Sequence, residues 1–418
     1  MESKRVVVTG LGAITPIGNT VKDFWEGLVN GKNGAGEITR FDSTLYKTHF
    51  ACEVKGYNPD DFFDKKTVRK YDLFAQFDIV AADEAIADSG ITPENTDFDD
   101  VGVLLTSGIG GVNHFFNEMK EFFLEGDGTP RFSPFLITKM IANIPGGVIS
   151  IKYGFRGPNY ATVSACASST HAIIDAFNLI RYGTCATMVA GGAGAAIGQL
   201  GVGGFNAMKA LSTRNDDPLT ASRPFDLNRD GFVMGEGAGS LVLEEYEHAV
   251  KRGAKIYAEV VGGGASADAY HITAPHPEGI GGALCMKRAL RDAGLAPEVV
   301  DHINTHGTST PMGDIAETLA IKEVFGEHAY DISINSTKSM TGHLLGGSGA
   351  VEAIASVLAL KNGIVPPTIN HFEDDPNIDP RLNFTFGKAC QRDIHYALSN
   401  SFGFGGQNAS LIFKKYES

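Results

Sequence analysis

The sequence predicts an α/β fold in which helices cover the faces of a sheet, and two observations carry this prediction. Short apolar runs with strand character alternate with longer runs of helical character along the chain. A short repeat also links the two parts of the chain, which indicates that the fold contains two related halves.

The first elements follow this alternation in order. We expect a strand over residues 5–9 and a helix over residues 20–29. Further strands are expected over residues 101–106, 188–191 and 240–244. This order is typical of sheets that are covered by helices.

The repeat consists of residues 85–90 (AIADSG) and residues 289–294 (ALRDAG). In both copies we expect a helix that ends at the glycine and leads towards a strand. We therefore predict two halves, residues 1–253 and residues 254–418. No low-complexity linker separates them, so they should share an extensive interface.

The composition restricts the partners and the compartment. The 418 residues include 35 basic and 49 acidic side chains, which give a net charge of −14. Such a protein repels nucleic acids and anionic membranes, so neither is expected as a partner, and an acidic partner must meet a local basic patch. The five cysteines form no CxxC pair, which argues against a disulfide framework or a metal site and favours the reducing cytoplasm. The N-terminal residues leave no room for a signal peptide, so export is not expected.

One stretch, residues 182–208, contains no charged side chain. It is dominated by Gly and Ala and lacks the large apolar residues that drive membrane insertion. We expect a buried strand and a close-packed turn here.

Cys166 is the strongest candidate for a nucleophile. It lies where a strand-like run over residues 160–165 meets a helical run over residues 167–182. A thiol at a helix N-terminus faces free backbone N–H groups, which favour the thiolate, and its own N–H could stabilise an oxyanion. The alternative is a small buried hydrophobic residue. That is our interpretation of the other cysteines, Cys52, Cys185, Cys285 and Cys390.

Two histidines lie in turns that are rich in Gly, Ser and Thr. His306 follows an apolar strand, and His343 lies shortly after Lys338. A single histidine is more often structural, but two at comparable strand ends favour chemistry. Lys338 could lower the pKa of a neighbour or hold a carboxylate such as Glu352, and a solvated surface lysine is the equal alternative.

Phe402 and Phe404 alternate with glycines, a pattern that permits backbone motion around a movable apolar plug. A β-bulge with core aromatic side chains is the alternative. Residues 6–15 begin like a dinucleotide-binding fingerprint, but Thr15 occupies the third glycine position and the signal is weak.

A basic cluster is spaced to form one face of a helix. Solvated surface is the usual role of such a cluster, yet in a protein this acidic it is the natural docking point for an acidic carrier. Its members are Lys65, Lys66, Arg69 and Lys70.

Several segments resemble the β-ketoacyl-acyl-carrier-protein synthases, and the resemblance covers essentially the whole chain. They are VSACASS from Val163, NTHGTST from Asn304, KSMTGH from Lys338, NSFGFGG from Asn400 and RPFDLNRDGF from Arg223. The chain looks most like the type II members, which elongate long acyl chains. The resemblance implies the thiolase fold, a five-layered αβαβα arrangement of two pseudo-repeated halves, and a homodimer in the cytoplasm.

The resemblance also implies the chemistry, a decarboxylating condensation of a malonyl carrier with a Cys-bound acyl chain. Cys166 in the first half would take the acyl group from acyl carrier protein, and His306 and His343 in the second half would face the malonyl thioester. The N–H groups of Cys166 and Phe402 would form an oxyanion hole, and Phe402 would act as a gate. No cofactor is needed, because the thioester carbonyl is the electron sink. The remaining implied roles are organisation of the histidines by Lys338, contact with the phosphopantetheine arm by Thr308 and Thr310, and acyl-chain selection by Ile109, while Phe404 joins the substrate-binding set.

The chain departs from the family pattern in two places. Gln407 stands where the family usually has Thr, and Gly347-Ser348 replaces a more usual Ala-Ala. We expect neither departure to touch a catalytic group, although Gln407 beside the gate could alter loop motion or acyl preference.

Other functions of the same fold remain open at this point. They are a polyketide-type ketosynthase, a coenzyme A-dependent thiolase or starter synthase, and a non-catalytic partner that resembles a chain-length factor. The last would be expected to lack the thiol, whereas Cys166 is present.

Overall fold

The computed structural model describes residues 3–417, and within them nine strands join into one hydrogen-bonded sheet. The strand order is β4-β5-β6-β1-β7-β13-β12-β8-β9. The strands are β1 (Val6–Ile14), β4 (Val101–Ser107), β5 (Thr187–Gly194), β6 (Gly237–Glu245), β7 (Ala258–Ala267), β8 (His302–Asn304), β9 (Ser333–Asn335), β12 (Tyr396–Gly403) and β13 (Gln407–Lys415). Two short pairs lie apart from it, β2 (Gly36–Glu37) with β3 (Phe50–Ala51) and β10 (Ile364–Val365) with β11 (Cys390–Gln391).

The sheet contains the same arrangement twice. In the first half, β1 pairs antiparallel with β6, β6 pairs antiparallel with β5, and β5 pairs parallel with β4. In the second half, β7, β13, β12 and β8 repeat these pairings in the same order and directions. The two sets join where β1 pairs antiparallel with β7, with Val6 opposite Val260. The predicted pair of pseudo-repeated halves is therefore confirmed.

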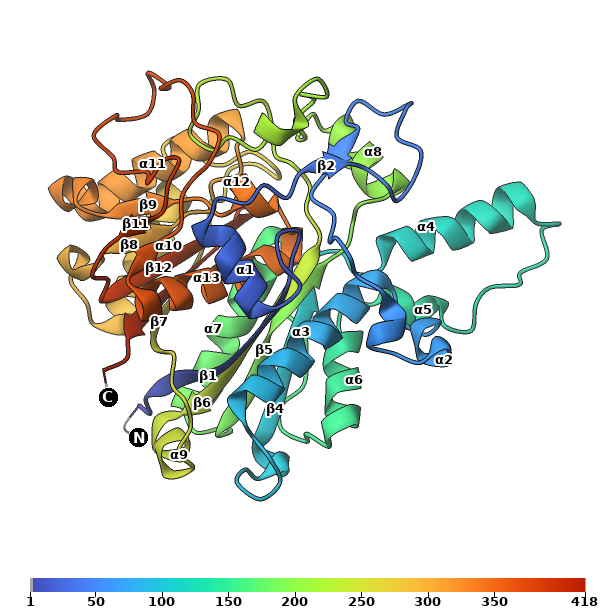
Figure 1. Cartoon of the computed structure of the whole chain (residues 1–418), viewed down its shortest axis with the longest axis horizontal. Helices are drawn as coiled ribbons and strands as arrows, with labels where there is room; N and C mark the ends of the chain where they lie inside the picture. The colour runs from blue at the N-terminus through green and yellow to red at the C-terminus, as the bar shows by residue number, and fades with distance from the viewer. Residues whose placement is uncertain (1–2, 418) are drawn as a thin grey trace.

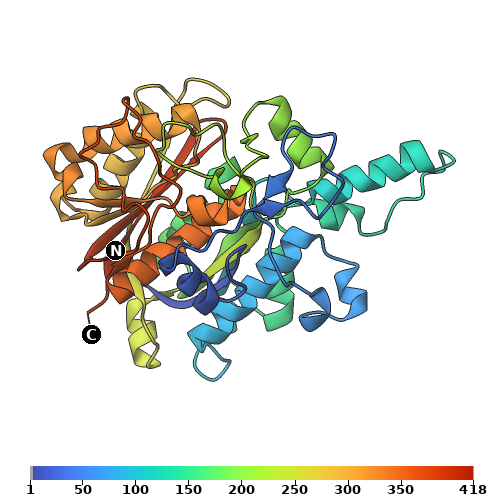
Figure 2. The ribbon, with the colours of Figure 1, turned by 45° about the horizontal axis from the view of Figure 1, so that its top comes forward.

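The structure has five layers. The strands of each half form one layer, one layer of helices lies between them, and one layer of helices covers each outer side (Figures 1 and 2). The helices α3 and α6 pack on the outer face of the first half, and α10 and α11 lie outside the second half. Between the halves, α7 and α13 contact each other and strands of both halves. These helices are α3 (Leu73–Ser89), α6 (Ile144–Tyr153), α7 (Ser168–Arg181), α10 (Ile280–Ala293), α11 (Pro311–Phe325) and α13 (Ser348–Asn362).

The remaining α-helices surround these layers. They are α1 (Val21–Val29), α2 (Lys65–Val68), α4 (Val112–Lys120), α5 (Leu136–Met140), α8 (Gln199–Ala207), α9 (Tyr246–Lys251) and α12 (Lys338–Thr341). In the described part of the chain, no helix has both the length and the apolar character needed to cross a membrane.

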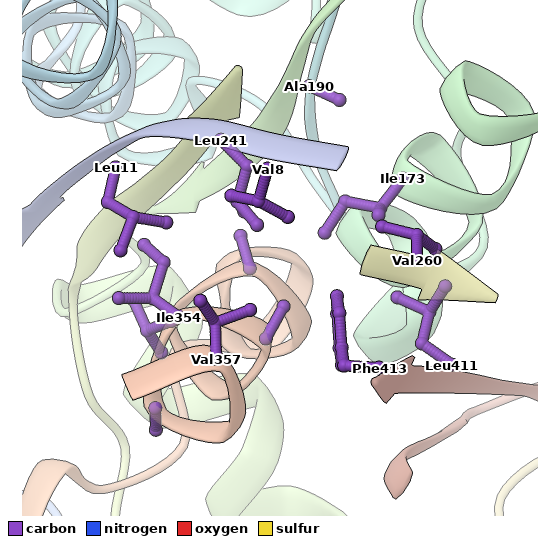
Figure 3. Packing of buried hydrophobic residues seen from close by; sticks show 14 of the residues in the cluster. Val8, Leu11, Ile173, Ala190, Leu241, Val260, Ile354, Val357, Leu411 and Phe413 are labelled. Carbon is purple, nitrogen blue, oxygen red and sulfur yellow. The ribbon is translucent and has the colours of Figure 1, made fainter. Parts of the chain in front are cut away.

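The main core fills the space between the two sets of strands. Figure 3 shows Val8 and Leu241 from the first half opposite Leu411 and Phe413 from the second, with Ile354 of α13 among them. All five side chains are buried at 1% exposure or less. Apolar burial on this scale is what holds the two halves together.

Glycines let the outer helices approach the central strands closely. A Cβ at Gly12 would lie 1.9 Å from the backbone oxygen of Ala81 in α3. At the equivalent place in β7, a Cβ at Gly264 would lie 2.2 Å from the backbone oxygen of Cys285 in α10. The glycines of residues 6–15 therefore serve helix packing, which explains why they only partly match a dinucleotide fingerprint.

Most of the expected elements are confirmed. The strand at residues 5–9 extends to Ile14, and Thr20 caps the N-terminus of α1 by accepting from the N–H of Asp23. The strands at residues 101–106, 188–191 and 240–244 lie within β4, β5 and β6. The repeated glycines Gly90 and Gly294 end their helices with φ of 69° and 65°.

Three expectations need correction or remain predictions. Residues 160–165 do not form a strand, since only Asn159 pairs with β4, through Val103. Residues 182–208 contain the expected buried strand β5, but their second part forms the helix α8, whose small residues pack closely. The division between residues 253 and 254 falls between α9 and β7 and stays a prediction.

Candidate active site

Cys166 lies in a short turn at the N-terminal side of α7. A 3₁₀ turn over Ala165–Ala167 precedes the helix, and Ala165 has a φ of 50°. The hydroxyl of Ser168 holds this turn by donating to the Ala165 oxygen at 2.7 Å and accepting the Ser164 N–H at 2.9 Å. Gly403 packs against it, because a Cβ there would lie 2.8 Å from the Ser164 oxygen. The thiol is thus held on a rigid turn at the seam between α7 and β12.

Burial dominates the ionisation of this thiol. It raises the pKa of Cys166 to about 11, while the charge of Lys338 and the backbone N–H of Phe404 act in the opposite direction. The backbone N–H groups of Phe404 and Cys166 do favour the thiolate, as expected for this position, but burial outweighs them, because α7 begins only at Ser168 and Cys166 is 8% exposed. The nucleophile is a thiol near pH 7 and must lose its proton during reaction.

His306 and His343 lie face to edge. Their ring centroids are 5.3 Å apart with an interplanar angle of 86°. Burial, with the positive charge of Lys338, holds the pKa of both imidazoles well below the usual value. Both rings are therefore neutral near pH 7, and each can donate one N–H to a substrate oxygen.

The backbone around each imidazole is tied to another element. The N–H groups of His306 and Gly307 donate to the carboxylate of Glu317 in α11, both at 2.8 Å. His343 donates its backbone N–H to the Val233 oxygen at 2.8 Å, and its own oxygen accepts the Gly235 N–H at 2.9 Å. Sequence reasoning missed Glu317, because α11 also contains Asp314, Lys322 and Glu323 and nothing in the pattern distinguishes one of these charged residues.

Lys338 pairs with the carboxylate of Glu352, and both side chains are 1% exposed. Burial raises the pKa of Glu352 to about 7, and the Lys338 charge acts against this. Of the two roles weighed for Lys338, the surface role is wrong and the pairing with Glu352 is confirmed. The lysine lowers the pKa of the thiol and of both imidazoles, so its charge reaches the whole site.

A single cavity of about 490 Å³ brings most of the predicted residues together. Its lining is mostly apolar, which suits an acyl chain, while Thr308 and Thr310 place hydroxyls 3.1 Å apart at one side. The predicted residues on its wall are Cys166, His306, His343, Phe402, Phe404, Thr308, Thr310 and Ile109.

The sequence of the chain matches one family over most of its length. Residues 3–249 match the Beta-ketoacyl synthase, N-terminal domain, and residues 257–372 match the Beta-ketoacyl synthase, C-terminal domain. The chain belongs to the β-ketoacyl synthase family. Among curated β-ketoacyl synthases, it is 52% identical over 417 residues to the 3-oxoacyl-(acyl-carrier-protein) synthase 2 of Synechocystis sp., covering 100% of this chain and 99% of that protein. It is 50% identical to the enzyme of the same name from Staphylococcus aureus (strain N315), covering 100% of both chains.

Solved β-ketoacyl synthase structures share the fold. One from Burkholderia phymatum superposes with a TM-score of 0.91 at 36% identity and covers 99% of this chain and 100% of its own. The ketosynthase in a complex described as a type II PKS acyl-carrier protein with its ketosynthase bound to the hexaketide gives a TM-score of 0.89 at 34% identity, covering 100% of both chains. The thiolase fold expected for a β-ketoacyl synthase is thereby confirmed.

The structure corrects the predicted role of one phenylalanine. The backbone N–H that faces the Cys166 thiol is that of Phe404, not that of Phe402. Phe402 pairs with Asn408 within the sheet, and its ring lies 5.8 Å from that of His306. The Gly405 and Gly406 that follow Phe404 have φ of 85° and 70°, so Phe404 rather than Phe402 adjoins the hinge-like turn.

One departure from the family pattern does touch a catalytic candidate. The Ser348 hydroxyl lies 2.9 Å from Nδ1 of His343, which contradicts the expectation that it contacts none. The side chain of Gln407 lies near Gly405 and is exposed, so it borders the turn after Phe404 without reaching the thiol.

The basic cluster lies on the surface, but it does not form one helical face. The helix α2 spans only Lys65–Val68, so Arg69 and Lys70 follow its end. Lys65, Lys66 and Arg69 are exposed, while Lys70 is half-buried. The other cysteines are buried as expected, except Cys390, which is exposed because it lies in the short surface strand β11.

Proposed function

We propose that this β-ketoacyl synthase condenses a malonyl-acyl-carrier-protein with an acyl chain on Cys166 and so elongates fatty acids by two carbons. The observation that carries the proposal is the cavity that holds one thiol and two neutral imidazoles on an apolar wall. The relatives at about half identity, named 3-oxoacyl-(acyl-carrier-protein) synthase 2, support this substrate class.

The first step transfers the acyl group to the enzyme. The Cys166 sulfur attacks the thioester carbonyl, the bond to the carrier sulfur breaks, and the thiol proton leaves with the carrier thiol. The N–H groups of Cys166 and Phe404 adjoin the sulfur, so they are placed to stabilise the developing oxyanion. The positive charge of Lys338 favours negative charge on sulfur during attack.

The second step removes carbon dioxide. The bond between the malonyl carboxylate and its α-carbon breaks, CO2 leaves, and the electron pair becomes an enolate on the thioester. His306 and His343 are neutral, so each ring carries one N–H that it can donate to that oxygen. The step uses the thioester carbonyl as its electron sink and draws on no cofactor.

The third step forms the new carbon bond. The enolate carbon attacks the acyl-Cys166 carbonyl, the thiolate leaves, and a proton from solvent restores the thiol. The product is a 3-oxoacyl carrier that is two carbons longer. Thr308 and Thr310, on the cavity wall beside His306, are placed to bond the amide groups of the carrier's phosphopantetheine arm. Ile109, which also lines the cavity, would contact the acyl chain.

The partners form part of the same proposal. Exposed Lys65, Lys66 and Arg69 would dock the acidic acyl carrier protein. A homodimer is supported by large apolar side chains on the surface, since Phe123 is 72% and Val163 is 60% exposed. The segment that bears Phe123 follows α4, which extends from the body of the molecule in Figure 1. The cytoplasmic location stays a prediction.

Intact mass spectrometry tests the function directly. The protein is incubated with a long-chain acyl carrier, and malonyl carrier is then added. We expect an acyl adduct on Cys166 that disappears as the longer 3-oxoacyl carrier forms. An adduct from acyl-coenzyme A and not from the carrier would support a thiolase or starter synthase instead, and no adduct from either would support a non-catalytic partner.

A further inference from the structure

The two imidazoles of the site differ in what their Nδ1 atoms contact. Nδ1 of His343 lies 2.9 Å from the Ser348 hydroxyl oxygen. Nδ1 of His306 is buried and has no hydrogen-bond partner anywhere in residues 3–417. The ring orientation and proton position of His343 are thus open to control by a side chain, and those of His306 are not.

Ser348 is the first residue of α13 and is 1% exposed. Within the described chain its hydroxyl makes one side-chain hydrogen bond, the one to His343. A buried hydroxyl without another acceptor donates its proton to the acceptor that it has, because an unmet buried donor is costly. The imidazole nitrogen that accepts this proton must be the bare one, so the ring proton of neutral His343 lies on Nε2.

Neighbouring residues restrain both the backbone and the ring of His343, so the tautomer determines which nitrogen atom carries a proton towards the cavity. Its backbone is bonded on both sides to the segment from Val233 to Gly235, and its ring packs at 5.3 Å against Phe232. With Nδ1 turned towards Ser348, Nε2 is left to the cavity that His343 lines.

We propose that Ser348 is a positioning residue, whose hydroxyl donates to Nδ1 of His343 and fixes the tautomer that presents Nε2–H to the substrate oxygen. This inference rests on the proposed function for its kinetic consequence. In that reaction, a ring in the other tautomer would present a bare nitrogen to the enolate and would repel it. Ser348 therefore supports the decarboxylation step and has no part in acyl transfer to Cys166.

The chain offers a matched control in the same helix. Ser356 is also fully buried, and its hydroxyl donates only to the Glu352 backbone oxygen at 2.8 Å. Ser348→Ala and Ser356→Ala thus remove the same atoms from the same helix, and only the first touches an imidazole.

Two measurements on the purified full-length variants test the inference. Decarboxylation of malonyl carrier and acyl transfer to Cys166 are timed separately, by CO2 release and by intact mass. For Ser348→Ala we expect kcat of decarboxylation to fall about 5- to 20-fold, the effect of one lost hydrogen bond at the reacting group, with KM and acyl transfer unchanged. Ser356→Ala should leave both steps unchanged. Decarboxylation by Ser348→Ala at the wild-type rate, or an equal loss in both steps, would overturn the proposal.

The ring nitrogens supply the second readout. Nitrogen NMR of the ¹⁵N-histidine-labelled protein, with His343→Gln to identify the signals of this ring, should show the Nε2–H tautomer in the wild type and a mixture in Ser348→Ala. A wild-type ring protonated on Nδ1, or an unchanged tautomer in Ser348→Ala, would also overturn it. If the wild type itself decarboxylates no malonyl carrier, the proposed function fails, while the nitrogen signals still decide the tautomer.

Discussion

The ammonium group of Lys338 and the carboxylate of Glu352 form an ion pair that is almost completely removed from water, with each side chain 1% exposed. They come from different helices, α12 and α13, on either side of the turn that carries His343. A buried ion pair contributes less to stability than its short contact suggests, but the loss of either partner leaves the other charge unpaired in the core.

We therefore predict that Lys338→Met destabilises the fold by about 3 kcal/mol. Urea unfolding followed by circular dichroism measures this. The double variant Lys338→Met with Glu352→Met should recover most of the stability, because neither charge is left unpaired, yet it should not recover condensing activity. Equal stability of the single and double variants would show that the pair does not act as a unit.

The second prediction concerns the pH dependence of Cys166. Burial raises its pKa to about 11, so the reactive thiolate fraction is small near neutrality and grows about tenfold per pH unit below that value. The rate of inactivation by iodoacetamide should rise steadily from pH 7 to pH 9.5. A Lys338→Met variant should react more slowly at each pH, because the charge that lowers the thiol pKa is gone. A rate that is level across this range would mean that the thiolate already predominates.

The third prediction separates the two half-reactions. His343→Ala should reduce malonyl decarboxylation about 100- to 1000-fold, the usual cost of removing one donor to a developing oxyanion. Acyl transfer to Cys166 should continue, because the N–H groups that face the sulfur belong to Cys166 and Phe404. Normal decarboxylation by a folded His343→Ala protein would contradict the assigned role.

The fourth prediction concerns carrier docking. Reversal of charge at Lys66 and Arg69 should raise KM for acyl carrier protein about tenfold at low salt, and the difference should shrink as salt screens the charges. A control with Lys251→Glu and Lys388→Glu changes the net charge equally at other exposed positions. Unchanged KM in the Lys66 and Arg69 variant, or an equal effect in the control, would remove the docking assignment.

The features of the fold that could be predicted from the sequence are those that depend on local patterns of residues. The strands of the first half and the two glycine helix ends follow from periodicity and from capping, which depend on a few neighbouring residues. The pairing of β1 with β7 could not be predicted in this way, because Val6 and Val260 are far apart in the sequence and no local pattern indicates that they lie opposite each other.

The site shows the same division. Cys166, His306 and His343 could be chosen because chemistry restricts these residue types. The raised pKa of Cys166 could not, since it arises from burial by segments that are distant in sequence. The contact of Ser348 with His343 was missed for another reason, as no pattern over five residues indicates which side of a turn a hydroxyl will face.

The active site lies between the two halves of the fold, and this position restricts how substrates enter. The nucleophile belongs to the first half and both imidazoles to the second, and the continuous hydrogen bonding of β1 to β7 keeps the halves from swinging apart. We expect access to come from small local movements of the cavity wall, which includes Gly406 and Asp268 and where the Gly406 oxygen accepts the Asp268 N–H. The rate of turnover would then be limited by the movement of a few residues of the cavity wall, while the backbone around the reacting atoms stays in place.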